Sequence, residues 1–195
     1  MTITNGYTTL ADIKARADIA TADATIDSLL EGYVEAASRL IDGETQRTFY
    51  ARTETHYFDI PKGRELRLDD DLLTITSVTN GDGTAIASTN YITVPKNHAP
   101  YYAIKLTEAS TVGWSLNSYG NSEAVIAVAG TWGRSSTAPA DIKEACAQIA
   151  HSALKRRFGE NLSSISMVTA AGVVITPQDI PAFAWRVIRR YRRMA

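Results

Sequence analysis

The few residues in this chain that could perform chemistry are not spaced as a catalytic or zinc site requires. The single cysteine, Cys146, falls on the apolar stripe of a predicted helix, and His151 follows five residues later on a different side of that helix. A thiol nucleophile needs a base within hydrogen-bond reach, so the sequence favours a buried core thiol. None of the three histidines (His56, His98 and His151) stands four residues from another or in a Cys/His cluster. A zinc site is therefore not expected.

The densest group of carboxylates is Asp69-Asp70-Asp71. Such a group could bind a divalent cation, but neighbours on an extended chain point to opposite faces, so at most two could share one ion. A solvated turn after a strand is the better interpretation, with no bound metal. The sequence contains neither GxxxxGK[ST] nor GxGxxG after a strand, so nucleotide binding has no support. We predict a protein that is not an enzyme and has no cofactor.

The one site-like feature is a helix rich in arginine, predicted to start near Asp179 with Pro181 in its first turn and to end in Arg192-Arg193. Its candidate binding residues are Trp185, Arg186, Arg189, Arg190, Tyr191, Arg192 and Arg193. Three interpretations stay open: a solvated basic face, contacts to nucleic-acid phosphates, and docking on an acidic protein partner with the aromatic residues as anchors. Arginine in place of lysine favours fixed, hydrogen-bonded contacts.

Three further helices are expected around these residues. The first spans about residues 10–17, with Thr9 as N-cap and Asp12 in its first turn. The second spans 24–43, is capped by Asp23, and repeats apolar residues at helical spacing. The third spans 139–158, opens on Pro139, and ends in a basic turn before Gly159. The two long helices each need a partner for their apolar stripe, and the simplest solution packs them on each other.

Residues 53–133 change to the alternation typical of strands. Strands are expected at 57–60, from Leu66 and Leu68 onward, at 91–94, at 101–106 and, apolar on both faces, at 124–129. Residues 61–63 supply one turn, and Asn80-Gly81-Asp82-Gly83 predicts a tight turn because glycine accepts positive φ. Residues 160–177 have little charge and no clean period, so we expect a loop there, with room for a short hairpin around Ala171-Gly172. The predicted fold class is α+β, a core of about four helices with an inserted antiparallel β-region.

Charge is distributed unevenly along the chain, although the formal net charge is only −1. Residues 1–133 hold 10 Lys and Arg against 17 Asp and Glu, a net of −7, while residues 134–195 hold 10 against 4, a net of +6. An acidic front and a basic end suggest a polar assembly, or an acidic partner for the C-terminal end. No apolar run is long enough to cross a bilayer, and no signal peptide is evident, so we expect the protein to stay in the cytoplasm where it is made.

Taken in order, these segments resemble the head–tail connector (adaptor or head completion) proteins of tailed bacteriophages. The resemblance rests on residues 7–14, on 34–42 followed by Arg47-Thr48-Phe49-Tyr50, on 66–78, on 139–146 with the basic helix end at 155–158, and on the closing 180–193. Each motif is weakly specific alone, whereas their order and spacing are typical of the family.

The resemblance implies a ring, commonly of twelve subunits, that lies beneath the portal in the virion and extends the channel through which DNA leaves the head. Its expected partners are the portal protein, other copies of itself, and a stopper or tail terminator protein, with DNA passing transiently and no membrane. Residues 1–52 and 134–195 would form the helical core of a single domain and 53–133 the insertion. The C-terminal segment, from Trp185 to Arg193, would dock on the portal.

Two alternatives remain open at this point. One is a nucleic-acid-binding protein that uses the arginine-rich helix, although the acidic first two thirds and a pI near 6.3 count against it. The other is a stopper or tail completion protein. The order of helices, strands and helices, with the terminal basic helix, favours the adaptor that lies next to the portal, assembled in the bacterial host.

Overall fold

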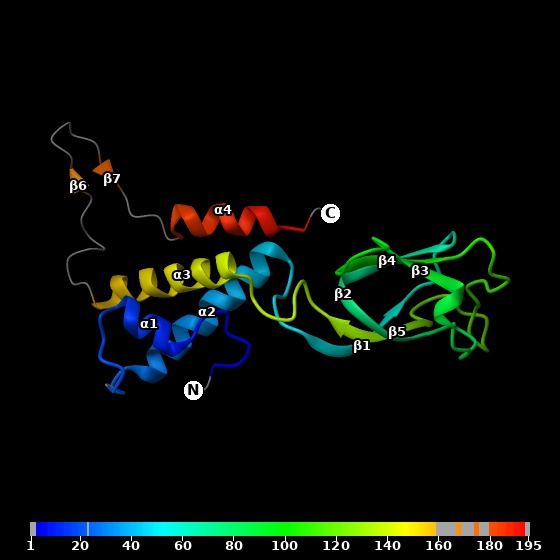
Figure 1. The fold of residues 1–195 in the computed structure, drawn as a ribbon, viewed down its shortest axis with the longest axis horizontal. Helices are drawn as coiled ribbons and strands as arrows, with labels where there is room; N and C mark the ends of the chain where they lie inside the picture. The colour runs from blue at the N-terminus through cyan, green and yellow to red at the C-terminus, as the bar shows by residue number, and fades with distance from the viewer. Residues whose placement is uncertain (1–2, 23, 159–166, 169–173, 176–179, 194–195) are drawn as a thin grey trace. The chain divides into compact units, whose positions relative to one another are not determined.

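The computed structural model describes residues 3–22, 24–158, 167–168, 174–175 and 180–193. The chain divides into two compact units: a helical unit, Met1–Gln46 with Ala138–Ala195, and a β-unit, Arg47–Thr137. The predicted fold class is confirmed, because a five-stranded antiparallel sheet is inserted between the second and third helices (Figure 1). None of the described helices combines the length and the apolar character that crossing a membrane requires.

The helical unit is built from α1 (Leu10–Arg16), α2 (Asp27–Thr45), α3 (Ala140–Phe158) and α4 (Ala182–Tyr191). α3 contacts all three others, and Figure 1 shows it between α4 on one side and α1 with α2 on the other. The predicted packing of the two long helices is thus confirmed. Their buried stripes supply most of the core, which includes Ile13, Leu30, Val34, Ile41, Ile142, Cys146, Ile149 and Ile188.

The first helix begins as predicted, whereas the second begins later. Thr9 and Asp12 form a reciprocal capping box at the start of α1. The predicted cap of the second helix, Asp23, lies outside the described residues, and α2 begins at Asp27 after Ile26, which makes no side-chain cap. Asp27 provides the carboxylate of the first turn and also pairs with the buried Lys14 Nζ at 2.5 Å. This pairing between α1 and α2 has no signal in helical periodicity.

The third and fourth helices differ from the prediction only in where they begin and end. α3 opens after Pro139, whose carbonyl accepts from Lys143 N at 2.9 Å. The predicted stop at Gly159 and the predicted start near Asp179 lie outside the described residues. α4 ends at Tyr191, so Arg192 and Arg193 follow the helix in place of forming its last turn. Strands β6 (Met167–Val168) and β7 (Val174–Ile175) pair antiparallel, and the predicted turn at Ala171-Gly172 lies outside the described residues.

The β-unit contains β1 (Arg52–Phe58), β2 (Glu65–Thr79), β3 (Tyr91–Val94), β4 (Tyr101–Leu106) and β5 (Ile126–Trp132), in the sheet order β1-β5-β2-β4-β3. β3 and β4 coincide with the predicted strands, and the turn at Asn80 is confirmed by its hydrogen bond from Gly83 N to Asn80 O at 2.9 Å. β5 begins and ends two to three residues later than the predicted strand at 124–129, and β1 shares only Tyr57 and Phe58 with the predicted strand at 57–60. The long β2 pairs with β4 through its first half and with β5 through its second, so the sheet curls around one apolar core.

Replacing glycine with alanine is expected to change the free energy of unfolding in opposite directions at two positions, one in each unit. A Cβ at Gly130, on β5 between β1 and β2, would lie 2.2 Å from the carbonyl oxygen of Thr74. Gly130→Ala should therefore lower the free energy of unfolding by about 1–3 kcal/mol, since the backbone of β2 must move. Gly32 lies inside α2 with nothing within 4 Å of a new Cβ, so Gly32→Ala should raise that free energy by about 1 kcal/mol. Denaturant titration of both variants measures the two free energies of unfolding. Equal values for the two variants would contradict the prediction.

Candidate functional site

The arginine-rich helix α4 is fixed to its unit by an apolar face. Ala184, Val187 and Ile188 are buried, and α4 contacts both α3 and α2. The helix begins after Pro181, whose carbonyl accepts from Trp185 N at 3.0 Å. Because the buried side chains lie on one side, the polar side chains must occupy the other. The helix is therefore a rigid support and not a loose tail.

The outward face of α4 is basic and aromatic, and we call it the α4 surface. Its exposed members are Phe183, Arg186, Arg189, Arg190 and Arg192, with Trp185, Tyr191 and Arg193 half-buried. The guanidinium carbon of Arg189 lies 5.7 Å from the Trp185 ring centre, and that of Arg190 lies 5.9 Å from the Tyr191 ring centre. Such contacts hold arginines over aromatic faces while their N–H groups remain available to a partner.

The C-terminal end of the α4 surface is tied to the two neighbouring helices. The Tyr191 hydroxyl donates to Asp141 Oδ1 at 3.2 Å, and Arg190 Nη1 lies 3.8 Å from Asp141 Oδ2. Arg193 N donates to the carbonyl oxygen of Thr45 at 2.9 Å, at the end of α2. The chain thus has a defined course as far as Arg193. One carboxylate, Asp141, offsets only part of the positive charge of this end.

Sequence reasoning grouped seven residues that do lie together, but it missed two of their neighbours. All seven predicted residues lie on or just after α4. Phe183, 41% exposed, belongs to the same surface, and its spacing of three and seven residues from Arg186 and Arg190 could have shown this. Asp141 could not have been found, because it reaches the surface only through the antiparallel packing of α3 and α4.

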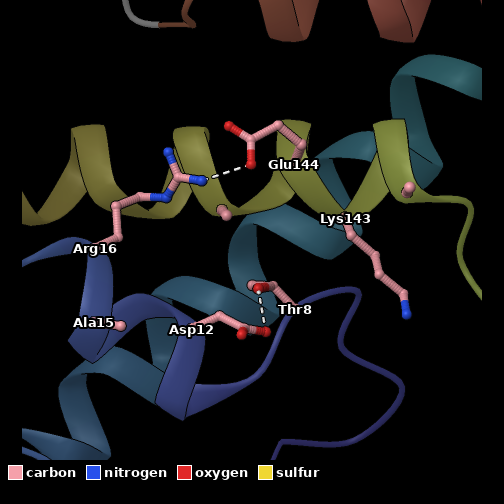
Figure 2. A pocket seen from close by; sticks show the side chains of 8 residues that line it. Thr8, Asp12, Ala15, Arg16, Lys143 and Glu144 are labelled. Carbon is pink, nitrogen blue, oxygen red and sulfur yellow. Dashed lines mark hydrogen bonds and ion pairs between the residues drawn. The ribbon is translucent and has the colours of Figure 1, made fainter.

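A second candidate is a groove of about 470 Å³ between α1 and α3, with alanine side chains and four charged residues along it (Figure 2). Arg16 Nη2 pairs with Glu144 Oε2 at 2.5 Å across the groove. The hydrogen bond from Gln148, and then Arg16, hold the pKa of Glu144 below its usual value. Hydrogen bonds from Thr9 hold the pKa of Asp12 below its usual value. Lowered values make both carboxylates poorer general bases near neutral pH.

These two carboxylates predict acid sensitivity of the helical unit. Their pKa values are lower in the folded chain than the ordinary values of 3.8 and 4.5, so the stabilisation is present above about pH 5 and is lost as pH falls through the folded values. A variant with Asp12→Asn and Glu144→Gln should lose less stability between about pH 5 and pH 3 than the native chain. Thermal unfolding against pH measures this, and parallel curves for the two proteins would refute it.

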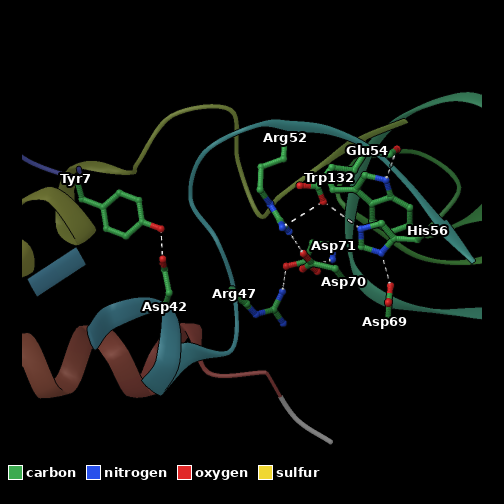
Figure 3. Close-up of polar contacts among 10 residues, drawn as sticks. All are labelled: Tyr7, Asp42, Arg47, Arg52, Glu54, His56, Asp69, Asp70, Asp71 and Trp132. Carbon is green, nitrogen blue, oxygen red and sulfur yellow. Dashed lines mark hydrogen bonds and ion pairs between the residues drawn. The ribbon is translucent and has the colours of Figure 1, made fainter. Parts of the chain in front are cut away.

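Asp69, Asp70 and Asp71 do not form the solvated turn that the sequence suggested. They lie inside β2, where the register against β4 shifts between Arg67 and Leu72. Asp71 pairs with Arg47 and Asp70 with Arg52, while His56 Nδ1 lies 2.8 Å from Asp69 Oδ1 (Figure 3). The irregular register lets consecutive carboxylates meet three separate partners. The expected solvated turn was wrong because these partners, 13 to 24 residues away, are not visible from local sequence.

Cys146 and His56 are both packed against neighbouring side chains. Cys146 is fully buried, with its Sγ 3.4 Å from Ser38 Oγ, and burial raises the pKa of its thiol, which confirms the core thiol. His56 stacks on Trp132 with ring centres 3.9 Å apart. Within the described ranges, no three His, Cys, Asp or Glu side chains gather closely enough to hold a metal ion.

Comparisons with known proteins give a fold and no family. No family model matches the sequence, and no curated protein matches it either. Two solved structures contain similar chains: the neck of an empty gene transfer agent particle, computed with C6 symmetry, and the virion of a native gene transfer agent particle. Each match covers 100% of this chain and 94% of the other at 16% identity, with a TM-score of 0.62. The whole chain, sheet insertion included, thus shares its fold with a chain of each particle.

Proposed function

We propose that this protein is a structural subunit of the neck of a tailed phage or phage-like particle, and not an enzyme. The observation that carries the proposal is the full-length likeness to a chain from the neck of a gene transfer agent particle. A likeness that spans both units is more informative than one confined to the helices, since four packed helices occur in many unrelated proteins. The protein would be located in the virion after assembly in the host cytoplasm.

Within the neck, we assign the chain to the adaptor ring between the portal and the stopper or tail, where it would extend the DNA channel. The similar neck was computed with C6 symmetry. A ring of twelve subunits, which the sequence resemblance implies, also contains a six-fold axis and is compatible with that symmetry. A stopper or tail completion protein is the alternative position in the same assembly.

The α4 surface would dock on the portal. Aromatic and arginine side chains held on a packed helix are the residues that most often dominate protein interfaces. Arg186, Arg189 and Arg192 are exposed, and a guanidinium can bind a carboxylate through two parallel hydrogen bonds. The complementary surface on the portal is therefore expected to be acidic.

A second candidate function, nucleic-acid binding, is favoured by the same arginines. Contacts to phosphates would make affinity fall steeply with salt and would be independent of any protein partner. The net charge of −1 and the nearby carboxylate of Asp141 weaken this candidate. The two functions can be separated by testing the portal and duplex DNA side by side.

The test is the mass of the purified chain by size exclusion with light scattering, alone and mixed with the portal protein encoded by the same genome. A complex of ring mass with the portal is expected. Deleting residues 181–195 is a poor probe, because it would uncover the apolar face of α3 that α4 buries. A chain that ignores the portal but binds duplex DNA at low salt would refute the adaptor function and support the alternative.

A further inference from the structure

We infer that the β-unit carries the contact between neighbouring copies in the ring. The loop that presents Tyr119 in one copy docks on the uncharged outer face of the β1-β5-β2 sheet in the next. This inference rests on the proposed ring and names an interface within it. It is carried by two exposed surfaces of the same unit.

The first surface is one face of the sheet around β5, which lies between β1 and β2. Along β5, residues alternate between buried and half-exposed, so only one face of the strand is covered. The register places nine residues in three cross-strand rows on the other face. They are Thr53, Thr131 and Thr74; Thr55, Ala129 and Ser77; and Tyr57, Ala127 and Thr79. None of the nine carries a charge at neutral pH, and Tyr57 stands out from the face at 64% exposure.

The second surface is the connection between β4 and β5. Residues 109–122 form a run of 14 without a charged side chain, bounded by Glu108 and Glu123. The run contains Leu116, 50% exposed, and Tyr119, 87% exposed. Large apolar side chains that gather in an uncharged exposed segment mark interaction sites more often than scattered ones do.

The structure holds Tyr119 on a rigid support. The Asn117 side-chain oxygen accepts from Tyr119 N at 3.0 Å and from Asn121 N at 2.9 Å, and Gly120 N donates to the Asn117 carbonyl at 2.9 Å. Below this tip, the buried Asn80 donates to Gly113 O at 2.8 Å and accepts from Ser115 N at 2.9 Å. The side chain is thus exposed although its backbone is fixed, so docking it would cost little ordering entropy.

The absence of charge points to a second copy as the occupant, and the small area points to a contact that forms only within an assembly. A surface without charge is best matched by another uncharged surface, since burying an unpaired charge against it would be costly. Two different surfaces that meet between identical chains make a heterologous contact, which forms a ring where the rotation closes. Three strands of five residues cover only roughly 200–250 Å² at normal sheet spacings, against about 800 Å² per partner in a stable complex. The contact is therefore expected inside the ring and not in a free dimer.

The test joins the two surfaces covalently. A variant with Ser118→Cys and Ser77→Cys places one thiol beside Tyr119 and one on the sheet face, while Cys146 stays buried and unreactive. After assembly with the portal, a short bis-maleimide should give a ladder of linked subunits. Each single variant, and the pair Tyr102→Cys with Ser77→Cys, should give no ladder. Tyr102 is an exposed tyrosine of the same unit that belongs to neither surface.

A second variant tests how much the Tyr119 side chain contributes to ring formation. Tyr119→Asp should reduce the yield of rings at least tenfold with an unchanged monomer fold, whereas Tyr102→Asp should leave the yield unchanged. Rings that form without a ladder, or that tolerate Tyr119→Asp, would overturn this interface and leave the proposed function standing. A chain that forms no oligomer with the portal would overturn both.

Discussion

Replacing Trp132 with alanine is expected to lower the free energy of unfolding of the β-unit by about 3–5 kcal/mol. Trp132 is fully buried at the end of β5 and has the largest side chain among the fully buried residues described. Its ring stacks on His56 with an angle of 10° between the planes, and its Nε1 donates to the Glu54 carbonyl oxygen at 3.1 Å. The substitution removes this packing, leaves a cavity, and deprives a carbonyl group of its donor.

The measurement is guanidinium denaturation, with amide hydrogen exchange in peptides from β5 as the readout for the β-unit. Labelling of the buried Cys146 thiol reports on the helical unit separately, because that thiol becomes accessible only when its core opens. Tyr102→Ala is the control, since it removes an exposed aromatic ring and should change stability by less than about 0.5 kcal/mol. Equal losses in the two variants would show that Trp132 has no special place in the core.

Features that depend only on residues close together in the chain were predicted correctly from the sequence. The capping box of Thr9 and Asp12 fixes the start of α1 through contacts three residues apart. The tight turn after Asn80 needs a glycine at positive φ, and Gly83 adopts a φ of +83°. Periodicity also indicated the faces of α2 and α3 that pack on each other, because helical spacing alone determines which residues share a side.

The pairing of strands and side chains that lie far apart in the chain could not be predicted from the sequence. β1 and β2 are consecutive in the chain, and yet β5 lies between them in the sheet. The side chains that pair with Asp69, Asp70 and Asp71 become neighbours only through that order and through the irregular register of β2. Lys14 is a similar case: on helical spacing a lysine is expected at the surface, but its ammonium pairs with Asp27 and its side chain is buried.

The α4 surface was predicted in part: its residues could be found from local sequence, but its packing could not. Arginines interleaved with aromatic residues at helical spacing predict a binding surface on α4 from local sequence alone. The packing of Val187 and Ile188 adds that the surface is preorganised, which lowers the entropy cost of docking. The uncharged β4–β5 loop carried no comparable signal, because the exposure of Tyr119 depends on the hydrogen bonds of Asn117.

Reversing the charge of two arginines on the α4 surface should weaken portal binding at least tenfold. In a variant with Arg186→Glu and Arg189→Glu, two attractive contacts to the expected acidic surface become repulsive, at a cost of about 1.4 kcal/mol or more in total. Both side chains are exposed and lie outside the packed face of α4, so the fold should be retained. Titration of the portal at several salt concentrations measures the affinity, and the native chain should lose affinity with salt faster than the variant.

A matched control separates a specific surface from a general change in net charge. Lys62→Glu with Arg67→Glu makes the same change of charge at two exposed positions of the β-unit, and this variant should bind the portal like the native chain. If both double variants lost affinity equally, the attraction would be a property of the whole molecule and the α4 surface would not be the docking element. If neither lost affinity, another face of the chain would have to meet the portal. Loss in the α4 variant alone is the result that the basic, aromatic and rigidly packed face of this helix predicts.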